Sequence, residues 1–266
     1  MNVDSDETKP FTFATAQQSL KENHQRWRKI KFSVDGLDQL AGGGISSRGI
    51  VEIAGEPGSG KTQLCLHLAL VCQMQCDTPR GIVYISTEHP FPSKRLVQME
   101  QAMKRSLGLT GDSKKFTDNI FVEHLNTAPA LEECITQRLP ILLENNPITL
   151  LIIDSITAAY TEEQNFVDRA HSFRRVVNGL HSLQDRFDFA IVCTNQVRSV
   201  VDSSTLDDER IVPAMGLAWG SLVHTRFQLS RVPGSSERRC QLLFCPTAAP
   251  GRSSFVITEA GISDFV

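Results

Sequence analysis

The sequence predicts an α/β fold with a mostly parallel central sheet, helices on both faces and an antiparallel extension at the C-terminus. Three observations support this prediction. Continuous apolar, β-branched runs alternate with longer helical stretches over residues 50–194. These runs have no polar face, which is typical of parallel strands that are buried on both sides. A glycine-rich segment at 55–60 joins the first of these runs to the first long helical stretch.

The expected elements follow one another in a regular order. Strands are predicted at 50–54, 81–86, 119–123, 148–153 and 189–194, and helices between them at 62–77, 92–107, 128–144 and 165–186. Short polar turns join the later runs at 222–230, 239–245 and 253–258, so we expect these to form the antiparallel extension. We expect one core domain at 31–266, preceded by an N-terminal tail and linking segment at 1–30.

Composition limits the class of protein. Of the 266 residues 41% are hydrophobic and 21% are charged, as in ordinary soluble globular proteins. The seven cysteines include no C-x-x-C pair, which favours a reduced, cytosolic or nuclear setting. The net charge is −3, without the basic excess of a dedicated nucleic-acid binder. Any DNA contact must therefore come from a local patch or from a partner.

The segment after strand 50–54 matches the phosphate-binding P-loop pattern G-x-x-x-x-G-K-[ST] at every position. It consists of Gly55, Glu56, Pro57, Gly58, Ser59, Gly60, Lys61 and Thr62. Its glycines let backbone N–H groups surround phosphates, and the helix that follows adds partial positive charge. In this pattern Lys61 reaches the phosphates and the Thr62 hydroxyl binds Mg²⁺. The alternative is a glycine turn with a chance lysine, but the flanking strand and helix favour a nucleoside triphosphate site.

Polar side chains follow three of the other predicted strands. Asp154 ends the fourth strand, where an acid can hold Mg²⁺, although core strands often end at exposed acids. Glu88 follows the second strand and is placed either to polarise the water that attacks a γ-phosphate or to cap the next helix. Asn195 and Gln196 follow the fifth strand, where an amide can sense the γ-phosphate or simply end the strand.

The order of these motifs resembles that of the RecA-like strand-exchange ATPases. The motifs are the P-loop, Ser86-Thr87-Glu88, Asp154-Ser155 and Thr194-Asn195-Gln196. The stretch 61–65 is similar to eukaryotic members, and the stretches 87–96 and 216–219 look most like the recombinase paralogs. The resemblance runs from about residue 11 to the end of the chain, and it implies a RecA-like P-loop ATPase core.

The resemblance also implies roles for particular residues. Glu88 would be the water activator, Gln196 the γ-phosphate sensor and Arg95 a neighbour of the nucleotide base. The implied cofactors are ATP and Mg²⁺, with Thr62 and Asp154 at the metal and with slow, DNA-dependent turnover. The implied partners are other recombinase paralog subunits, the main recombinase and single-stranded or branched DNA, which the chain alone binds weakly. The implied setting is double-strand break repair by homologous recombination in the nucleus, and also the cytoplasm.

An F-x-x-A motif near the N-terminus indicates a subunit contact. In the resembling family this motif adds a strand and a buried Phe to the adjacent subunit, which is a physically sensible interface. Two registers are open here, Phe11 with Ala14 or Phe13 with Ala16, and the first aligns better. Phe and Ala are common, so the motif gains its value from its position ahead of the core.

The chain also departs from the family pattern. His89 replaces the glycine that follows the acid in active recombinases, and Ser221 stands where the family has a sensor histidine. The first DNA loop corresponds to 161–168, which is short and acidic. The second follows Gln196 and mixes Arg198 and Arg210 with several acids. Loops of this charge repel a phosphate backbone. In the cap over ATP at 245–250 the family's Pro is kept, but its Asp is not.

Three functions are compatible with these features. The first is an ATP-binding assembly subunit of a recombination-repair complex, which an intact P-loop beside acidic DNA loops favours. The second is a strand-exchange recombinase that forms its own filament on DNA. The third is a small-molecule P-loop kinase, which the strand-end Glu and the Asn-Gln pair argue against.

Overall fold

The computed structural model of the chain describes residues 15–18, 28–75, 80–109, 115–161, 165–201, 209–213 and 215–265, with the backbone alone at 198–201 and 209–213. Of the predicted partner residues, Phe11, Phe13 and Ala14 lie outside the described residues, and Ala16 is exposed in a short helical stretch. None of the described helices is long and apolar enough to cross a bilayer.

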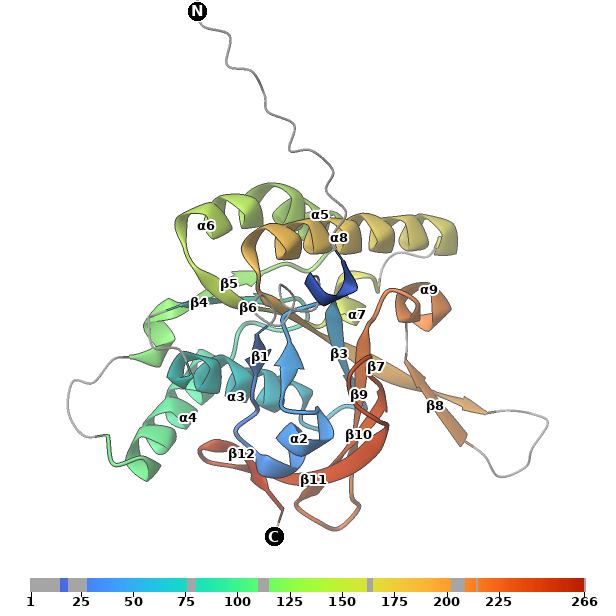
Figure 1. Cartoon of the computed structure of the whole chain (residues 1–266). Helices are drawn as coiled ribbons and strands as arrows, with labels where there is room; N and C mark the ends of the chain where they lie inside the picture. Colours follow the sequence, from blue (N-terminus) through green and yellow to red (C-terminus); the bar gives the residue numbers. More distant parts are fainter. Residues whose placement is uncertain are drawn as a thin grey trace, which may run out of the picture.

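A sheet whose central strands are all parallel forms the middle layer, as predicted (Figure 1). These strands are β3 (Ile50–Gly55), β4 (Gly81–Ser86), β5 (Ile120–His124), β6 (Ile148–Asp154), β7 (Ala190–Val201) and β9 (Thr225–Arg231). They lie side by side in the order β9-β3-β7-β6-β4-β5. The carboxyl ends of β3, β4, β6 and β7 therefore meet at one edge of the sheet, which is where α/β proteins bind ligands.

Antiparallel strands extend the sheet beyond β9, as expected for the C-terminal segment. They are β10 (Glu237–Phe244), β11 (Gly251–Thr258) and β12 (Gly261–Asp264). The run predicted at 222–230 differs in one respect, because β9 pairs with β3 in parallel and the change of direction comes after it. An apolar pattern does not show strand direction, since the same alternation suits both. In this part of the chain β12 is not predicted, and neither is β8 (Glu209–Pro213), which pairs antiparallel with the end of β7.

Helices cover both faces of the sheet (Figure 1). On one face lie α3 (Lys61–Met74) and α4 (Ser93–Ser106); on the other lie α5 (Ala128–Glu133), α6 (Leu139–Asn145) and α8 (Phe166–Phe187). Successive residues of a strand point to opposite faces. Ile152 of β6 accordingly joins the core under α3, whereas Leu151 and Ile153 join the core under α8.

Helix α3 has almost no exposed side. Every residue from Leu64 to Gln73 is buried, because the sheet, α4 and β12 surround the helix. His67 lies among them with its Nε2 2.8 Å from the Phe32 carbonyl oxygen, and its Nδ1 accepts a hydrogen bond from Ile262 N at 3.2 Å. The helix that carries the P-loop residues Lys61 and Thr62 is thus anchored in the core.

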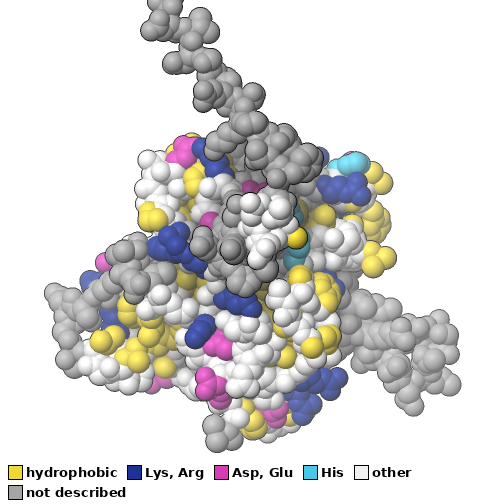
Figure 2. All heavy atoms as spheres, in the orientation of Figure 1, with side chains coloured by type: hydrophobic (Ala, Val, Ile, Leu, Met, Phe, Trp, Pro, Cys, Tyr) yellow, Lys and Arg dark blue, Asp and Glu magenta, His cyan; other side chains and the backbone are white. Residues whose placement is uncertain are grey.

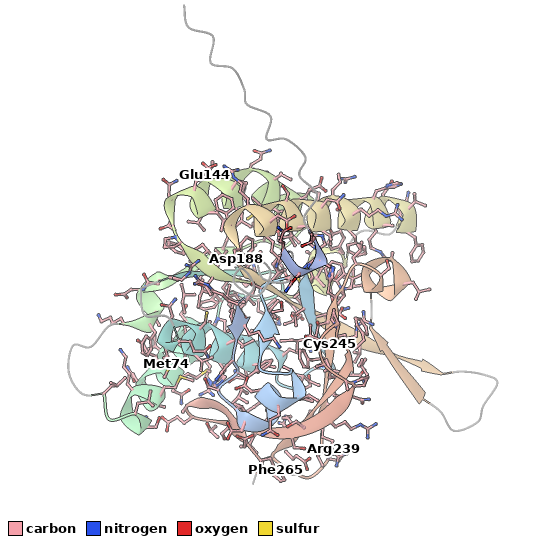
Figure 3. All side chains as sticks on the ribbon, in the orientation of Figure 1. Met74, Glu144, Asp188, Arg239, Cys245 and Phe265 are labelled. Carbon is pink, nitrogen blue, oxygen red and sulfur yellow. The ribbon has the colours of Figure 1, made fainter. Side chains whose placement is uncertain are left out.

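Hydrogen bonds from side chains fix both ends of α8. At its start the Asn165 side-chain oxygen accepts from the backbone N–H groups of Val167 at 2.9 Å and Asp168 at 3.4 Å. The first N–H groups of a helix have no partner within it, so this cap stabilises the first turn. At the other end lies Asp188, which is labelled in Figure 3. Its φ is 51°, and its carboxylate accepts a hydrogen bond from the Ser47 hydroxyl at 3.0 Å.

The helix predicted at 128–144 is present with an irregular centre. α5 passes into a π-helical turn, η2 (Cys134–Arg138), and then into α6, whose second residue is Pro140. Pro140 lacks an N–H group and cannot make the usual helical hydrogen bond, and a single wider turn accommodates this. Periodicity over the whole stretch predicts the helix but not the turn inside it.

Several short elements were absent from the prediction. They are β1 (Lys29–Ile30), α2 (Asp35–Leu40), β2 (Ile45–Ser46), η1 (Phe116–Asn119), α7 (Ile156–Ala159) and α9 (Gly216–Gly220). None spans more than six residues, which is too few for a hydrophobic period to be recognised.

Candidate nucleotide-binding site

The P-loop lies between the end of β3 and the start of α3, as the sequence predicts. Gly58 and Gly60 have φ values of 75° and 107°, which residues with a side chain rarely adopt. A Cβ atom on Gly55 would lie 2.7 Å from the backbone carbonyl oxygen of Leu229, which cannot move aside as a side chain can, so this position also requires glycine. The loop is consequently a turn of backbone that leaves the first N–H groups of α3 without helical partners.

Lys61 lies across this loop. Its ammonium group donates hydrogen bonds to the carbonyl oxygens of Gly55 at 2.8 Å and Glu56 at 3.0 Å. Burial lowers the pKa of Lys61, and the nearby carboxylates of Asp154 and Glu88 oppose that effect. The lysine is therefore close enough to the two predicted acids for their charges to act on it.

Asp154 forms the centre of the site at the end of β6. One carboxylate oxygen, Oδ2, accepts hydrogen bonds from the hydroxyls of Thr62 at 2.8 Å and Tyr84 at 2.7 Å. The other, Oδ1, accepts from the Thr194 hydroxyl at 2.5 Å. Burial and the adjacent Asp154 charge raise the pKa of Tyr84 well above its usual value, so the phenol remains a donor. The predicted pair of Thr62 and Asp154 is brought into direct contact.

Glu88 and Gln196 are also brought together. Glu88 lies just after the end of β4, and Gln196 lies within β7. The Gln196 side-chain amide donates to a Glu88 carboxylate oxygen at 3.2 Å. The hydroxyl of Thr87 binds both the N–H and the carbonyl of Ser155, at 2.8 and 2.5 Å, which holds the end of β4 against the end of β6. Glu88 is thereby held near the end of β6 with its carboxylate bonded to Gln196, and the N-cap residue of α4 is Pro92, not Glu88.

Arg95 lies at one side of the P-loop helix. Its guanidinium donates to the Gln63 side-chain oxygen at 2.8 Å and to the carbonyl oxygens of Thr258 and Glu259 at 2.6 and 3.1 Å. These contacts hold α4 against α3 and against the β11–β12 turn. Gln63 directly follows the P-loop Thr62, so Arg95 is close to the site, although it is engaged by protein groups.

The residues at this edge fit a nucleoside triphosphate that carries Mg²⁺. The hydroxyl of Ser59 is buried within the loop without a hydrogen-bond partner among the described atoms. Thr62 and Asp154 supply hard oxygen ligands of the kind that Mg²⁺ takes together with phosphate oxygens and water. The described part of the chain holds no cluster of three or more His, Cys, Asp or Glu side chains suited to a metal. A cation here would need phosphate oxygens to complete its coordination.

Other predicted positions do not join this cluster. His89 is exposed and lies 3.7 Å from the Glu88 carboxylate. The Ser221 hydroxyl donates to the Ala218 carbonyl oxygen at 3.3 Å, on the surface of α9. Cys245 is half-buried; burial alone would raise its pKa, but hydrogen bonds from Thr247, Thr225 and Ala248 lower it overall. Residues 162–164 and 202–208 of the two predicted DNA loops lie outside the described residues.

The structure adds residues that sequence reasoning missed. Tyr84 lies within an apolar strand run that gives no sign of its contact with Asp154. The hydroxyl of Thr157 in α7 accepts a hydrogen bond from the Gln196 backbone N–H at 3.0 Å. Glu52 is fully buried. The sequence does indicate it, because it is the only charged residue in the otherwise apolar strand β3.

The chain is similar to known proteins over most of its length. The family model described as Rad51 matches residues 24–265. The chain is 32% identical to "DNA repair protein XRCC3" of Mus musculus, over 92% of the chain and 77% of that protein. It is 29% identical to the "DNA repair protein XRCC3 homolog" of Arabidopsis thaliana, over 88% and 92%, and 30% identical to "DNA repair protein XRCC3" of Bos taurus, over 91% and 75%. With this match over nearly its whole length, the chain belongs to the Rad51 family, a RecA-like ATP-binding family of DNA repair and recombination.

Proposed function

We propose that this protein is an ATP-binding subunit of a homologous-recombination repair complex in the nucleus. In this role it assists the assembly or remodelling of the strand-exchange filament at double-strand breaks. The observation that carries the proposal is the convergence of Lys61, Thr62, Asp154, Glu88 and Gln196 at one sheet edge. The acidic composition of both predicted DNA loops favours an assembly subunit over a protein that coats DNA by itself.

Each group at the edge has a distinct part in this function. The backbone N–H groups of the P-loop and the Lys61 ammonium would bind the phosphates, and Arg95 would lie near the base. Thr62 and Asp154 are the residues that would hold Mg²⁺, which neutralises charge on the phosphate oxygens when bound. Glu88 would orient and polarise the attacking water, and the Gln196 amide would bind the γ-phosphate.

The partners in this proposal are other recombinase paralog subunits and the main recombinase. The F-x-x-A motif, in either register, supplies one contact to an adjacent subunit. DNA, single-stranded or branched, would be bound weakly by the chain alone.

Substitution of Lys61 tests the nucleotide site directly. A Lys61→Ala variant should bind a fluorescent ATP analogue at least about 100-fold more weakly, because charge-assisted hydrogen bonds to phosphate are lost. The measurement is a titration in the presence and absence of Mg²⁺. Lys31→Ala removes an exposed lysine from the loop before α2 and serves as the control, with unchanged affinity. Wild-type affinity in Lys61→Ala would refute the site.

The alternative function, a recombinase that forms its own filament on DNA, predicts a different result. On the face shown in Figure 2, Lys and Arg side chains lie in separate groups among polar and acidic ones. We expect the isolated chain to bind DNA weakly and with a shallow dependence on salt. The measurement is DNA affinity across a salt series. Tight binding with a steep slope, which reports many neutralised phosphates, would favour the alternative.

A further inference from the structure

A buried carboxylate connects the P-loop strand to three other elements. Glu52 lies in β3 and is completely buried. Its Oε1 accepts hydrogen bonds from the side-chain amide of Asn195 at 2.6 Å and from the indole N–H of Trp219 at 2.7 Å. Its Oε2 accepts from the guanidinium Nε of Arg226. The donors come from β7, α9 and β9, so one side chain holds all three against β3.

This cluster is energetically demanding. A buried carboxylate is tolerated only when it is paired and its oxygens are hydrogen-bonded, and here Arg226 supplies the opposite charge. Trp219 is also fully buried and packs on Phe173 of α8, with ring centroids 5.5 Å apart. Loss of any one partner would leave a buried polar group unpaired, so the relative positions of these groups are tightly constrained.

Further hydrogen bonds extend from the cluster toward the nucleotide site. The Asn195 side-chain oxygen accepts from the Thr157 hydroxyl at 2.6 Å, and that hydroxyl accepts from the backbone N–H of Gln196 at 3.0 Å. The Gln196 side chain in turn donates to Glu88 at 3.2 Å. A chain of hydrogen bonds therefore runs from the Trp219 indole to the backbone N–H of Gln196, and the Gln196 side chain links it to Glu88, the predicted water activator.

We propose that Glu52 and Thr157 are positioning residues that couple α9 to the nucleotide site through this chain of hydrogen bonds. The inference rests on the proposed function, since it assigns a route by which the bound nucleotide is sensed. A γ-phosphate competes with Glu88 for the Gln196 amide, and movement of Gln196 is transmitted through Thr157 and Asn195. Hydrogen bonds in such a buried network reinforce one another, so a change at one end alters the other.

Trp219 itself reports this coupling. The sequence contains two tryptophans, Trp27 and Trp219, so Trp27→Phe leaves Trp219 as the sole tryptophan, which is excited selectively over the two tyrosines. In that protein a slowly hydrolysed ATP analogue with Mg²⁺ should shift the Trp219 emission, and ADP, which lacks the γ-phosphate, should shift it less. Binding of each nucleotide is verified independently with a fluorescent analogue.

Substitution of Thr157 then tests the route. Thr157→Val keeps the side-chain shape but removes the hydroxyl, and it should abolish the emission shift while nucleotide affinity stays within about twofold. Turnover should fall about fivefold, as expected for one lost hydrogen bond to a positioned group. Thr157→Ser restores the hydroxyl and should restore both properties. Thr136→Val removes an exposed hydroxyl from η2 and is the matched control.

A second variant keeps the proposal testable if Thr157→Val does not fold. Trp219→Phe removes the indole N–H and keeps a ring against Phe173, so it should lower turnover without weakening nucleotide binding. An unchanged Trp219 emission in the nucleotide-bound protein, or a full response in Thr157→Val, would overturn the coupling and leave the proposed function standing. Failure of the fluorescent analogue to bind the wild-type chain would instead refute the proposed function.

Discussion

Three hydroxyl groups meet at the Asp154 carboxylate, and they differ in how far the sequence predicts them. The contact with Thr62 is predicted, because the P-loop and a strand-end acid are read from local patterns. Thr194 stands beside a predicted amide, although its own role is not indicated. Tyr84 is not predicted at all, since an aromatic residue in an apolar strand is normally core. Contacts between residues on neighbouring strands depend on register, which a local pattern does not contain.

Replacement of Glu88 by Gln separates binding from turnover. Glu88→Gln should leave ATP affinity within about twofold and reduce hydrolysis at least about 100-fold, because the amide no longer polarises water. The measurement is steady-state ATP hydrolysis together with a binding titration. Glu144→Gln removes a carboxylate that makes a surface ion pair with Arg186 and serves as the control. Equal turnover in Glu88→Gln and the wild type would exclude the water-activating role.

His67 makes the stability of the fold depend on pH. Burial lowers its pKa from 6.5 to about 4. As pH falls below about 6.5, His67 becomes protonated in the unfolded chain but stays neutral in the folded chain. Stability contributed by neutral His67 is thus complete above that pH and is lost on going down to pH 4, by about 3 kcal/mol.

Chemical denaturation between pH 7 and pH 4 measures this effect. In His67→Gln the decline in the free energy of unfolding over this range should be shallower, because glutamine does not titrate. His171→Gln, at an exposed position on α8, should retain the wild-type slope. The same slope in both variants would contradict the assignment to His67.

At the scale of elements, long periodic segments were predicted and short or irregular ones were not. The strands of the parallel sheet and the helices α3, α4 and α8 are confirmed close to their predicted bounds, except that β7 continues past its predicted end at 194 to Val201. The π-helical turn at Cys134–Arg138 was missed because Pro140 affects hydrogen bonding without interrupting the apolar period. The parallel pairing of β9 was missed because direction depends on the path of the chain between strands.

The cap of α8 is testable at this scale. Asn165→Ala removes the acceptor for two backbone N–H groups and should destabilise the protein by about 1 kcal/mol. Asn165→Asp keeps an acceptor and adds a charge that the helix N-terminus favours, so its stability should be close to wild type. Thermal or chemical unfolding gives both values. A loss in Asn165→Asp as large as that in Asn165→Ala would show that the cap is not the cause.

At the scale of the whole molecule, the sequence predicts the layers but not the order of the strands. Alternation of strands and helices is enough to indicate a sheet covered on both faces. The order β9-β3-β7-β6-β4-β5 decides which strand ends become neighbours, and it places β7 between β3 and β6. The meeting of Gln196 with Glu88, on strands separated by β6, follows from that order and from the length of β7.

The subunit contact belongs to this scale as well. Replacement of Phe11 and Phe13 together by Glu should release a co-purified paralog subunit, since a charge cannot enter an apolar pocket unpaired. Size-exclusion chromatography of the co-expressed complex shows the outcome. Phe265→Glu, at an exposed position near the C-terminus, should leave the complex intact. An unaltered elution profile in the double variant would count against the F-x-x-A contact.

The enclosure of α3 has a consequence for communication between subunits. Residues 64–73 of this helix are buried and cannot be contacted by another protein. A neighbouring subunit therefore cannot detect a nucleotide at the P-loop by binding to this part of the helix. A subunit that responds to the nucleotide would instead contact the edge of the sheet where β3, β4, β6 and β7 end, or residues coupled to that edge through the core.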